Sequence, residues 1–125
     1  MNPTIKYTLV SLFILFFCSE TMFAQNAAVK RADKLMSSFN FTKAAEILKS
    51  AVTKDPANGP AKEKLANCYR ILNNTVDAEF WYAQLKAMPN AKPEVILQYA
   101  QLLKANKKYD LANEMYDTYF FWLHP

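Results

Sequence analysis

The sequence predicts an all-α protein made of stacked helix pairs, and three observations support this prediction. Small residues recur every 34 positions, at Ala32, Ala66, Ala100 and at Ala44, Ala78, Ala112. Large apolar residues keep the same spacing, at Leu35, Tyr69, Leu103 and at Leu48, Tyr82, Tyr116. A chain of 125 residues with a single glycine, Gly59, favours helices joined by short turns over a sheet. A period of this length is typical of a helical repeat array.

The first 24 residues form a separate segment. Lys6 supplies a positive charge, residues 7–18 are apolar, and Ala24 stands at the end of a region suited to cleavage. This order is typical of a secretory signal peptide, so we expect an exported protein that is periplasmic or outer-membrane-associated. A membrane span needs about 20 apolar residues, and Glu20 interrupts this run. An adaptor tethered to the membrane by an uncleaved anchor is the alternative.

Three repeats follow, at residues 25–58, 59–92 and 93–125. We expect helices at residues 26–38 and 42–54 in the first repeat, 61–72 and 76–87 in the second, and 94–105 and 110–121 in the third. Pro56 and Pro89 cannot continue a helix interior, whereas Pro60 and Pro93 suit the first turn of the next helix. The recurring alanines are placed where the two helices of a pair cross, because a small side chain lets backbones approach closely.

This pattern resembles the tetratricopeptide repeat (TPR) family over residues 26–121. The resemblance implies a right-handed superhelical stack of about three repeats, whose first helices line a concave groove. The resemblance places these residues in the groove: Val29, Asp33, Met36, Ser37, Glu63, Asn67, Arg70, Ile71, Leu97, Gln101, Lys104 and Ala105. It implies a non-catalytic scaffold that binds a protein or peptide segment there. Asn67 and Gln101 would bond an extended backbone, and Arg70 and Lys104 would meet an acidic group.

One function known in this family is not expected. TPR modules that grip chaperone C-termini carry basic residues where this chain has Glu63 and Glu94. Two carboxylates at these positions would repel the terminal carboxylate of such a peptide.

A second resemblance concerns the opening of the processed chain. Residues 24–34 and the run Phe41-Thr42-Lys43-Ala44 look like the start of OmpA-family envelope proteins associated with type IX secretion and gliding. In those proteins a TPR segment precedes a β-propeller and a peptidoglycan-binding domain, and neither follows here before Pro125. The alternative function is therefore a truncated remnant of such a protein.

The last predicted helix is unusually apolar. Tyr119, Phe120, Phe121 and Trp122 follow one another, although solenoids normally end in a polar cap. We expect this segment to support self-association or docking on another subunit, or to mark a chain shortened from a longer ancestor.

The remaining chemistry predicts neither an enzyme nor a cofactor. Cys68 is the one cysteine left after processing and is expected to be a buried apolar residue. His124 is the single histidine, so no set of metal ligands can be assembled. The net charge of +4 is mild and its lysines are spread along the helices, which argues against nucleic-acid binding.

Overall fold

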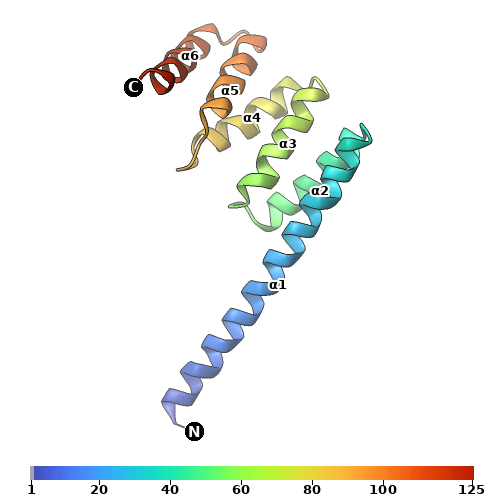
Figure 1. The fold of residues 1–125 in the computed structure, drawn as a ribbon, viewed down its shortest axis with the longest axis vertical. Coiled ribbons are helices and arrows are strands. Elements are labelled where there is room, and N and C mark those ends of the chain that lie inside the picture. Colours follow the sequence, from blue (N-terminus) through green and yellow to red (C-terminus); the bar gives the residue numbers. More distant parts are fainter. Residues whose placement is uncertain (1) are drawn as a thin grey trace.

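The computed structural model describes the backbone of residues 2–125 and the side chains of residues 2–12 and 27–125 (Figure 1). The described residues form six helices and no strand, so the fold is all-α. The helices are α1 (Pro3–Ser37), α2 (Phe41–Lys54), α3 (Gly59–Ile71), α4 (Thr75–Lys86), α5 (Pro93–Ala105) and α6 (Tyr109–Leu123). With one exception, each boundary lies within two residues of its predicted position.

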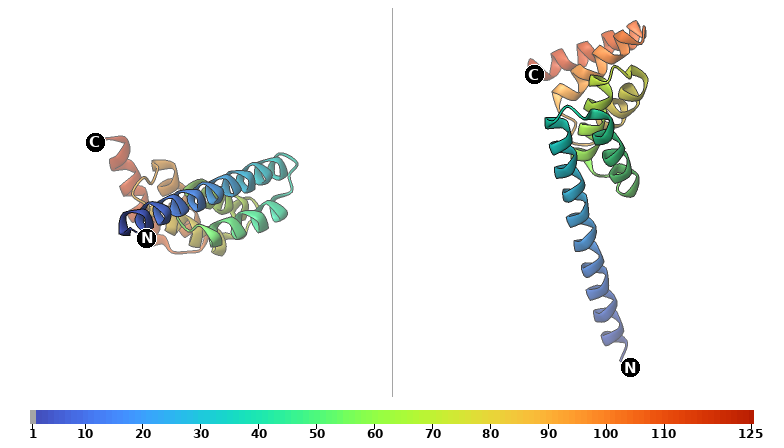
Figure 2. Two further views of the ribbon diagram at one scale, coloured as in Figure 1. Left: turned by 90° about the horizontal axis from the view of Figure 1, so that it is seen from below. Right: turned by 90° about the vertical axis from the view of Figure 1, so that its right-hand side faces the viewer.

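The exception is the start of α1. We expected a helix from Asn26, but α1 begins at Pro3 and runs unbroken into the first repeat, projecting from the packed body (Figure 2). The sequence has no proline or glycine between Pro3 and Ser37, so neither helix-breaking residue interrupts α1 after its first turn. Most of the predicted signal segment, with the expected cleavage at Ala24, lies outside the residues whose side chains are described. Among the residues that the structure describes, no helix has the length and apolar character needed to cross a bilayer.

Each helix pair is closed by the same turn. Phe39, Asn73 and Lys107, spaced by 34 residues, all have a positive φ, of 58°, 57° and 62°. In each turn the next residue donates its N–H to a carbonyl five positions back, as Asn40 does to Leu35 at 2.8 Å. This is the Schellman arrangement, which satisfies carbonyl groups that would otherwise be left open at a helix end. The turn therefore repeats in geometry although its residue type changes.

The second helix of the first two repeats begins with the same cap. The side chains of Asn40 and Asn74 accept hydrogen bonds from the backbone N–H three residues later, and Asn58 does the same for α3. Asparagine suits this role because its side-chain oxygen replaces a missing backbone acceptor. The two helices of the third repeat are preceded by lysine at the corresponding positions, Lys92 and Lys108, and neither side chain caps its helix.

These two lysines instead connect the third repeat to the second. The Nζ of Lys92 lies 3.1 Å from Glu63 of α3, and the Nζ of Lys108 lies 2.6 Å from Glu79 of α4. Asn106 adds a second contact, donating to Glu79 at 2.6 Å. Hydrogen bonding to Glu79 and the charge of that carboxylate raise the pKa of Lys108. Charged contacts thus link the repeats where local capping is absent.

The core lies where the predicted alanines allow helices to cross. Five of the six repeat alanines are fully buried, and Ala112 is 2% exposed. Around them lie three apolar clusters, one following another along the chain, with Leu48 and Leu65 in the first, Tyr82 in the second and Leu103 in the third. Each helix packs against its neighbours in sequence, and α1 also touches α3. The result is a stack of helix pairs.

We predict that Ala66→Leu will destabilise the fold. Ala66 is fully buried between neighbouring helices, so the extra carbon atoms of a leucine have no space to occupy. Overpacking of this kind costs about 1–3 kcal/mol of unfolding free energy, measurable by urea denaturation. Ala105→Leu, at an exposed site in the last turn of α5, is the control and should change stability little. Equal effects of the two substitutions would contradict the role assigned to Ala66.

We also predict that Lys107→Gly will stabilise the fold. The positive φ of Lys107 is unfavourable for a residue with a Cβ, and glycine removes that cost. A gain of roughly 0.5–1 kcal/mol is expected, read as a higher melting temperature. The control is Gln101→Gly at an exposed site inside α5, which should lose about 1 kcal/mol because glycine disfavours a helix interior. A loss of stability in both variants would argue against strain at the turn.

Candidate functional site

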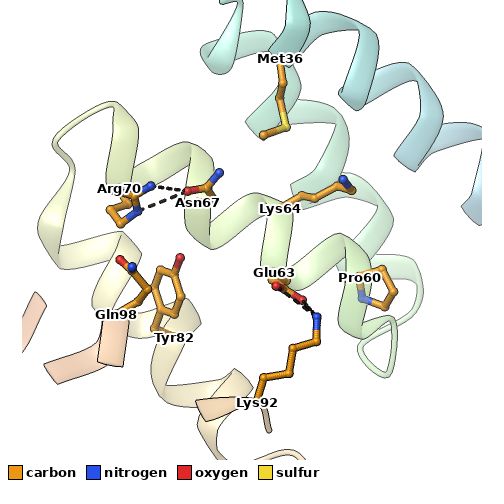
Figure 3. A pocket seen from close by; sticks show the side chains of 9 residues that line it. All are labelled: Met36, Pro60, Glu63, Lys64, Asn67, Arg70, Tyr82, Lys92 and Gln98. Carbon is orange, nitrogen blue, oxygen red and sulfur yellow. Dashed lines mark hydrogen bonds and ion pairs between the residues drawn. The ribbon is translucent and has the colours of Figure 1, made fainter. Parts of the chain in front are cut away.

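A polar groove crosses all three repeats on one side of the stack (Figure 3). It has a volume of about 480 Å³ and is open to solvent. Its lining comes from α1, α3, α4, α5 and the segment before α5: Met36, Pro60, Glu63, Lys64, Asn67, Arg70, Tyr82, Lys92 and Gln98. Helix α3 contributes most of these side chains because it lies in the middle of the stack. The groove is thus a composite of residues distant in sequence.

The structure brings together four of the twelve residues that the TPR resemblance places in the groove. Met36, Glu63, Asn67 and Arg70 all line the groove. A fifth, Asp33, lies beside it and forms an ion pair of 2.6 Å with Lys64. Their role in partner binding stays a prediction.

Like Ala105, three further residues predicted in the third repeat lie outside this groove. Leu97, Gln101 and Lys104 are all on α5. Gln101 and Lys104 are exposed, and Leu97 is half-buried. On α5 the groove is lined by Gln98, one residue further along the helix than Leu97. These three residues therefore lie outside the hollow formed by the first two repeats and the start of the third.

Sequence reasoning missed four polar lining residues: Lys64, Tyr82, Lys92 and Gln98. Lys64 and Gln98 are 34 residues apart, so the repeat register itself could have paired them. Tyr82 was assigned only to core packing, yet its ring is buried while its side chain also borders the groove. Lys92 precedes a helix and shares no phase with the other lining residues. Only its contact with Glu63 in the structure shows that Lys92 belongs to the groove lining.

Arg70 and Asn67 form the polar centre of the groove. The Oδ1 of Asn67 accepts hydrogen bonds from Nε and Nη2 of Arg70, at 3.2 and 2.7 Å. These two bonds orient the guanidinium and leave about three of its five N–H donors for another acceptor. The amide nitrogen of Asn67 also stays able to donate. Together the two side chains can bind a carboxylate and a neighbouring carbonyl oxygen.

The other charges of the groove are largely paired. Lys92 neutralises Glu63 and Asp33 pairs with Lys64, whereas no carboxylate among the described residues lies within 4.0 Å of Arg70. The negative charge expected from Glu63 is therefore offset by a residue that sequence reasoning did not consider. The resulting electrostatic character of the groove is positive, with the excess at Arg70.

Two side chains at the floor complete the site. Burial raises the pKa of the Tyr82 hydroxyl, and the charge of Arg70 partly offsets this effect. The Oε1 of Gln98 is buried and has no hydrogen-bond partner among the described residues. A buried acceptor without a donor is unfavourable, and this oxygen is not accessible from the groove. The groove thus offers a cation and an amide.

Other candidate residues are outside this groove. Cys68 is fully buried, as expected, and burial raises the pKa of its thiol despite the nearby charge of Lys64. Phe120, Phe121 and Trp122 are exposed at the end of α6, whereas Tyr119 is half-buried against the third apolar cluster. The ring of His124 lies 4.7 Å from that of Phe120.

One comparison with known proteins agrees with the fold. Residues 35–91 match the model of the tetratricopeptide repeat family. The matched stretch runs from the end of α1 to the loop before α5 and so contains most of the groove lining. A comparison with curated proteins finds no match. The family match and the stacked helix pairs together support a tetratricopeptide repeat protein.

Proposed function

We propose that this chain is a non-catalytic scaffold of the bacterial cell envelope that binds an extended, acidic segment of a partner protein in its groove. The observation that carries the proposal is the orientation of Arg70 by Asn67, in a groove where the other charges are largely paired. TPR repeats generally mediate protein–protein interactions, which supports a scaffold. The family is typically non-catalytic.

The shape and chemistry of the groove favour an extended chain over a compact ligand. The lining spans three repeats, and Arg70 and Asn67 can donate hydrogen bonds from its centre. An extended peptide presents C=O groups along its length that can accept them. An acidic side chain on it would meet the guanidinium of Arg70.

The envelope location rests on the opening of the chain. The order of Lys6, the apolar residues 7–18 and Ala24 is that of an export signal. Residues 24–34 resemble the start of envelope proteins of the OmpA family, which supports the same compartment. The tethered adaptor is the second candidate, favoured by the unbroken course of α1 from Pro3 into the first repeat.

We predict that Arg70→Ala will weaken binding of an acidic peptide about tenfold, because a charge-assisted hydrogen bond is lost. The probe is a fluorescent decapeptide in which Glu alternates with Ser, compared by anisotropy with the same peptide carrying Gln. The unaltered protein should prefer the Glu peptide, and Arg70→Ala should abolish the preference.

The matched control is Lys104→Ala, which removes an exposed cation outside the groove. It should leave the preference unchanged. Equal binding of the two peptides by the unaltered protein, or an equal loss in both variants, would refute an acidic segment at Arg70.

We predict that the protein produced from the full-length gene in a bacterial host begins at Gln25 and is recovered from the periplasmic fraction. N-terminal sequencing and fractionation measure this. Ala24→Arg should block processing, since the cleavage site requires a small residue, whereas Ala27→Arg should not. A chain that keeps its first residues and stays with the inner membrane would instead support the tethered adaptor.

A further inference from the structure

The hydroxyl group of Tyr82 reaches the polar groove from the core of the stack. Tyr82 is on α4, and among the described lining residues it is the one that comes from the second helix of a repeat. Its ring belongs to the core, since the residue is only 5% exposed. Figure 3 shows the hydroxyl directed toward the side of the groove that carries Arg70 and Asn67. Tyr82 therefore combines an apolar ring in the core with a polar atom at the groove.

The ring of Tyr82 is fixed by packing between α3 and α5. It shares a buried cluster with Ala66 of α3 and with Val95 and Leu102 of α5. A ring packed in this way has little freedom to turn, so no large entropic cost remains when its hydroxyl contacts a ligand. The hydroxyl is therefore preorganised for a contact in the groove.

Of the three residues at this repeat position, only Tyr82 lines the groove. Leu48 in the first repeat is fully buried and has no polar side-chain atom. Tyr116 in the third repeat is half-buried and packs against the third apolar cluster. A buried ring and a hydroxyl at the groove thus occur together in the second repeat, beside Arg70.

Arg70 is the charged neighbour of this hydroxyl. Burial raises the pKa of the Tyr82 hydroxyl, the charge of Arg70 and hydrogen bonding to Arg70 lower it, and the charge of Glu63 raises it. The net change in the pKa is upward, so the hydroxyl stays protonated at neutral pH and can donate a hydrogen bond. Arginine has donors and no acceptor, so Arg70 does not take up this proton.

The described acceptors of the groove do not take it up either. The Oδ1 of Asn67 accepts from Arg70, and both carboxylate oxygens of Glu63 accept from the lysine of its ion pair. The Oε1 of Gln98 has no hydrogen-bond partner among the described residues, so Tyr82 does not donate to it. The hydroxyl is thus a donor at the groove, next to the remaining N–H donors of Arg70.

We propose that the acidic side chain of the bound segment is held in a fork between the Arg70 guanidinium and the Tyr82 hydroxyl. This inference rests on the proposed function and adds to it a second contact, which makes Tyr82 a residue that determines specificity. A carboxylate has two acceptor oxygens, so both groups can donate to it at once. A glutamine side chain has one acceptor oxygen and no charge, and its amide N–H groups would face donors. The fork therefore favours an acid over its amide.

Tyr82→Phe tests the fork, because it removes the hydroxyl and keeps the ring in the core. The probes are the Glu and Gln decapeptides described above, and the measured quantity is the ratio of their dissociation constants. The substitution should lower this preference for Glu about threefold, since one hydrogen bond to the carboxylate is lost. Binding of the Gln peptide should change little. Each variant is produced from the full-length gene, purified in the form that accumulates, and checked for helicity by circular dichroism.

Tyr116→Phe is the matched control. It removes a hydroxyl from the same repeat position, on a side chain that does not line the groove. Its preference for the Glu peptide should equal that of the unaltered protein.

Two further measurements address the contact itself. Arg70→Ala combined with Tyr82→Phe completes a double-mutant cycle, and Tyr82→Phe should have little further effect once Arg70 is removed, because both groups hold one carboxylate. In the unaltered protein, binding of the Glu peptide should shift the near-ultraviolet absorption of tyrosine, and Tyr82→Phe should remove that shift.

Failure of the fork can be distinguished from failure of the proposed function. If the unaltered protein prefers the Glu peptide and a folded Tyr82→Phe variant keeps the whole preference, the fork is wrong and the acidic segment at Arg70 stands. An equal loss of preference in Tyr116→Phe would also overturn the fork, since the effect would then not depend on the groove. Equal binding of both peptides by the unaltered protein would overturn both proposals.

Discussion

The close approach of paired helices at buried alanines is the constraint on which this structure depends. Ala66 and Ala78 meet where α3 and α4 cross, and both are fully buried. A larger side chain at such a crossing would separate the backbones and shift every later helix, because each helix packs mainly on its neighbours in sequence. The groove lining depends on the same spacing. Met36 and Gln98 border one hollow only because the helices between them are closely packed.

The third repeat is joined to the second differently from the way the second is joined to the first. The asparagine caps of the first two repeats are replaced by Lys92 and Lys108, which reach Glu63 and Glu79. A cap stabilises its own helix, whereas these ion pairs stabilise the position of one repeat against another. The contact of Lys92 with Glu63 also removes a negative charge from the groove. The presence of lysine in place of asparagine before α5 and α6 therefore affects both the stacking of the repeats and the charge of the groove.

The groove could be predicted from the sequence only in part. Repeat phase located Met36, Glu63, Asn67 and Arg70, because these side chains lie on the regular inner face of first helices. It did not locate Tyr82, which belongs to a second helix, or Lys92, which precedes a helix and enters the groove through a contact 29 residues away. It placed Leu97, Gln101 and Lys104 in a groove whose lining on α5 is Gln98. The position of a residue within the 34-residue repeat tells only which face of its own helix it lies on. A groove is bounded by several elements at once.

The sequence by itself determined the helical class, the period of 34 residues, the buried alanines and nearly all helix boundaries. These features follow from the spacing of residues along the chain and from the conformational limits of proline and glycine. Both can be seen in the sequence itself. The tertiary structure decided which charges are paired and which acceptor is left without a donor at Gln98. These properties depend on distances between helices, and no local pattern contains them. The unbroken course of α1 from Pro3 agrees with the absence of proline and glycine up to Ser37, a local feature that the expected cleavage at Ala24 led us to set aside.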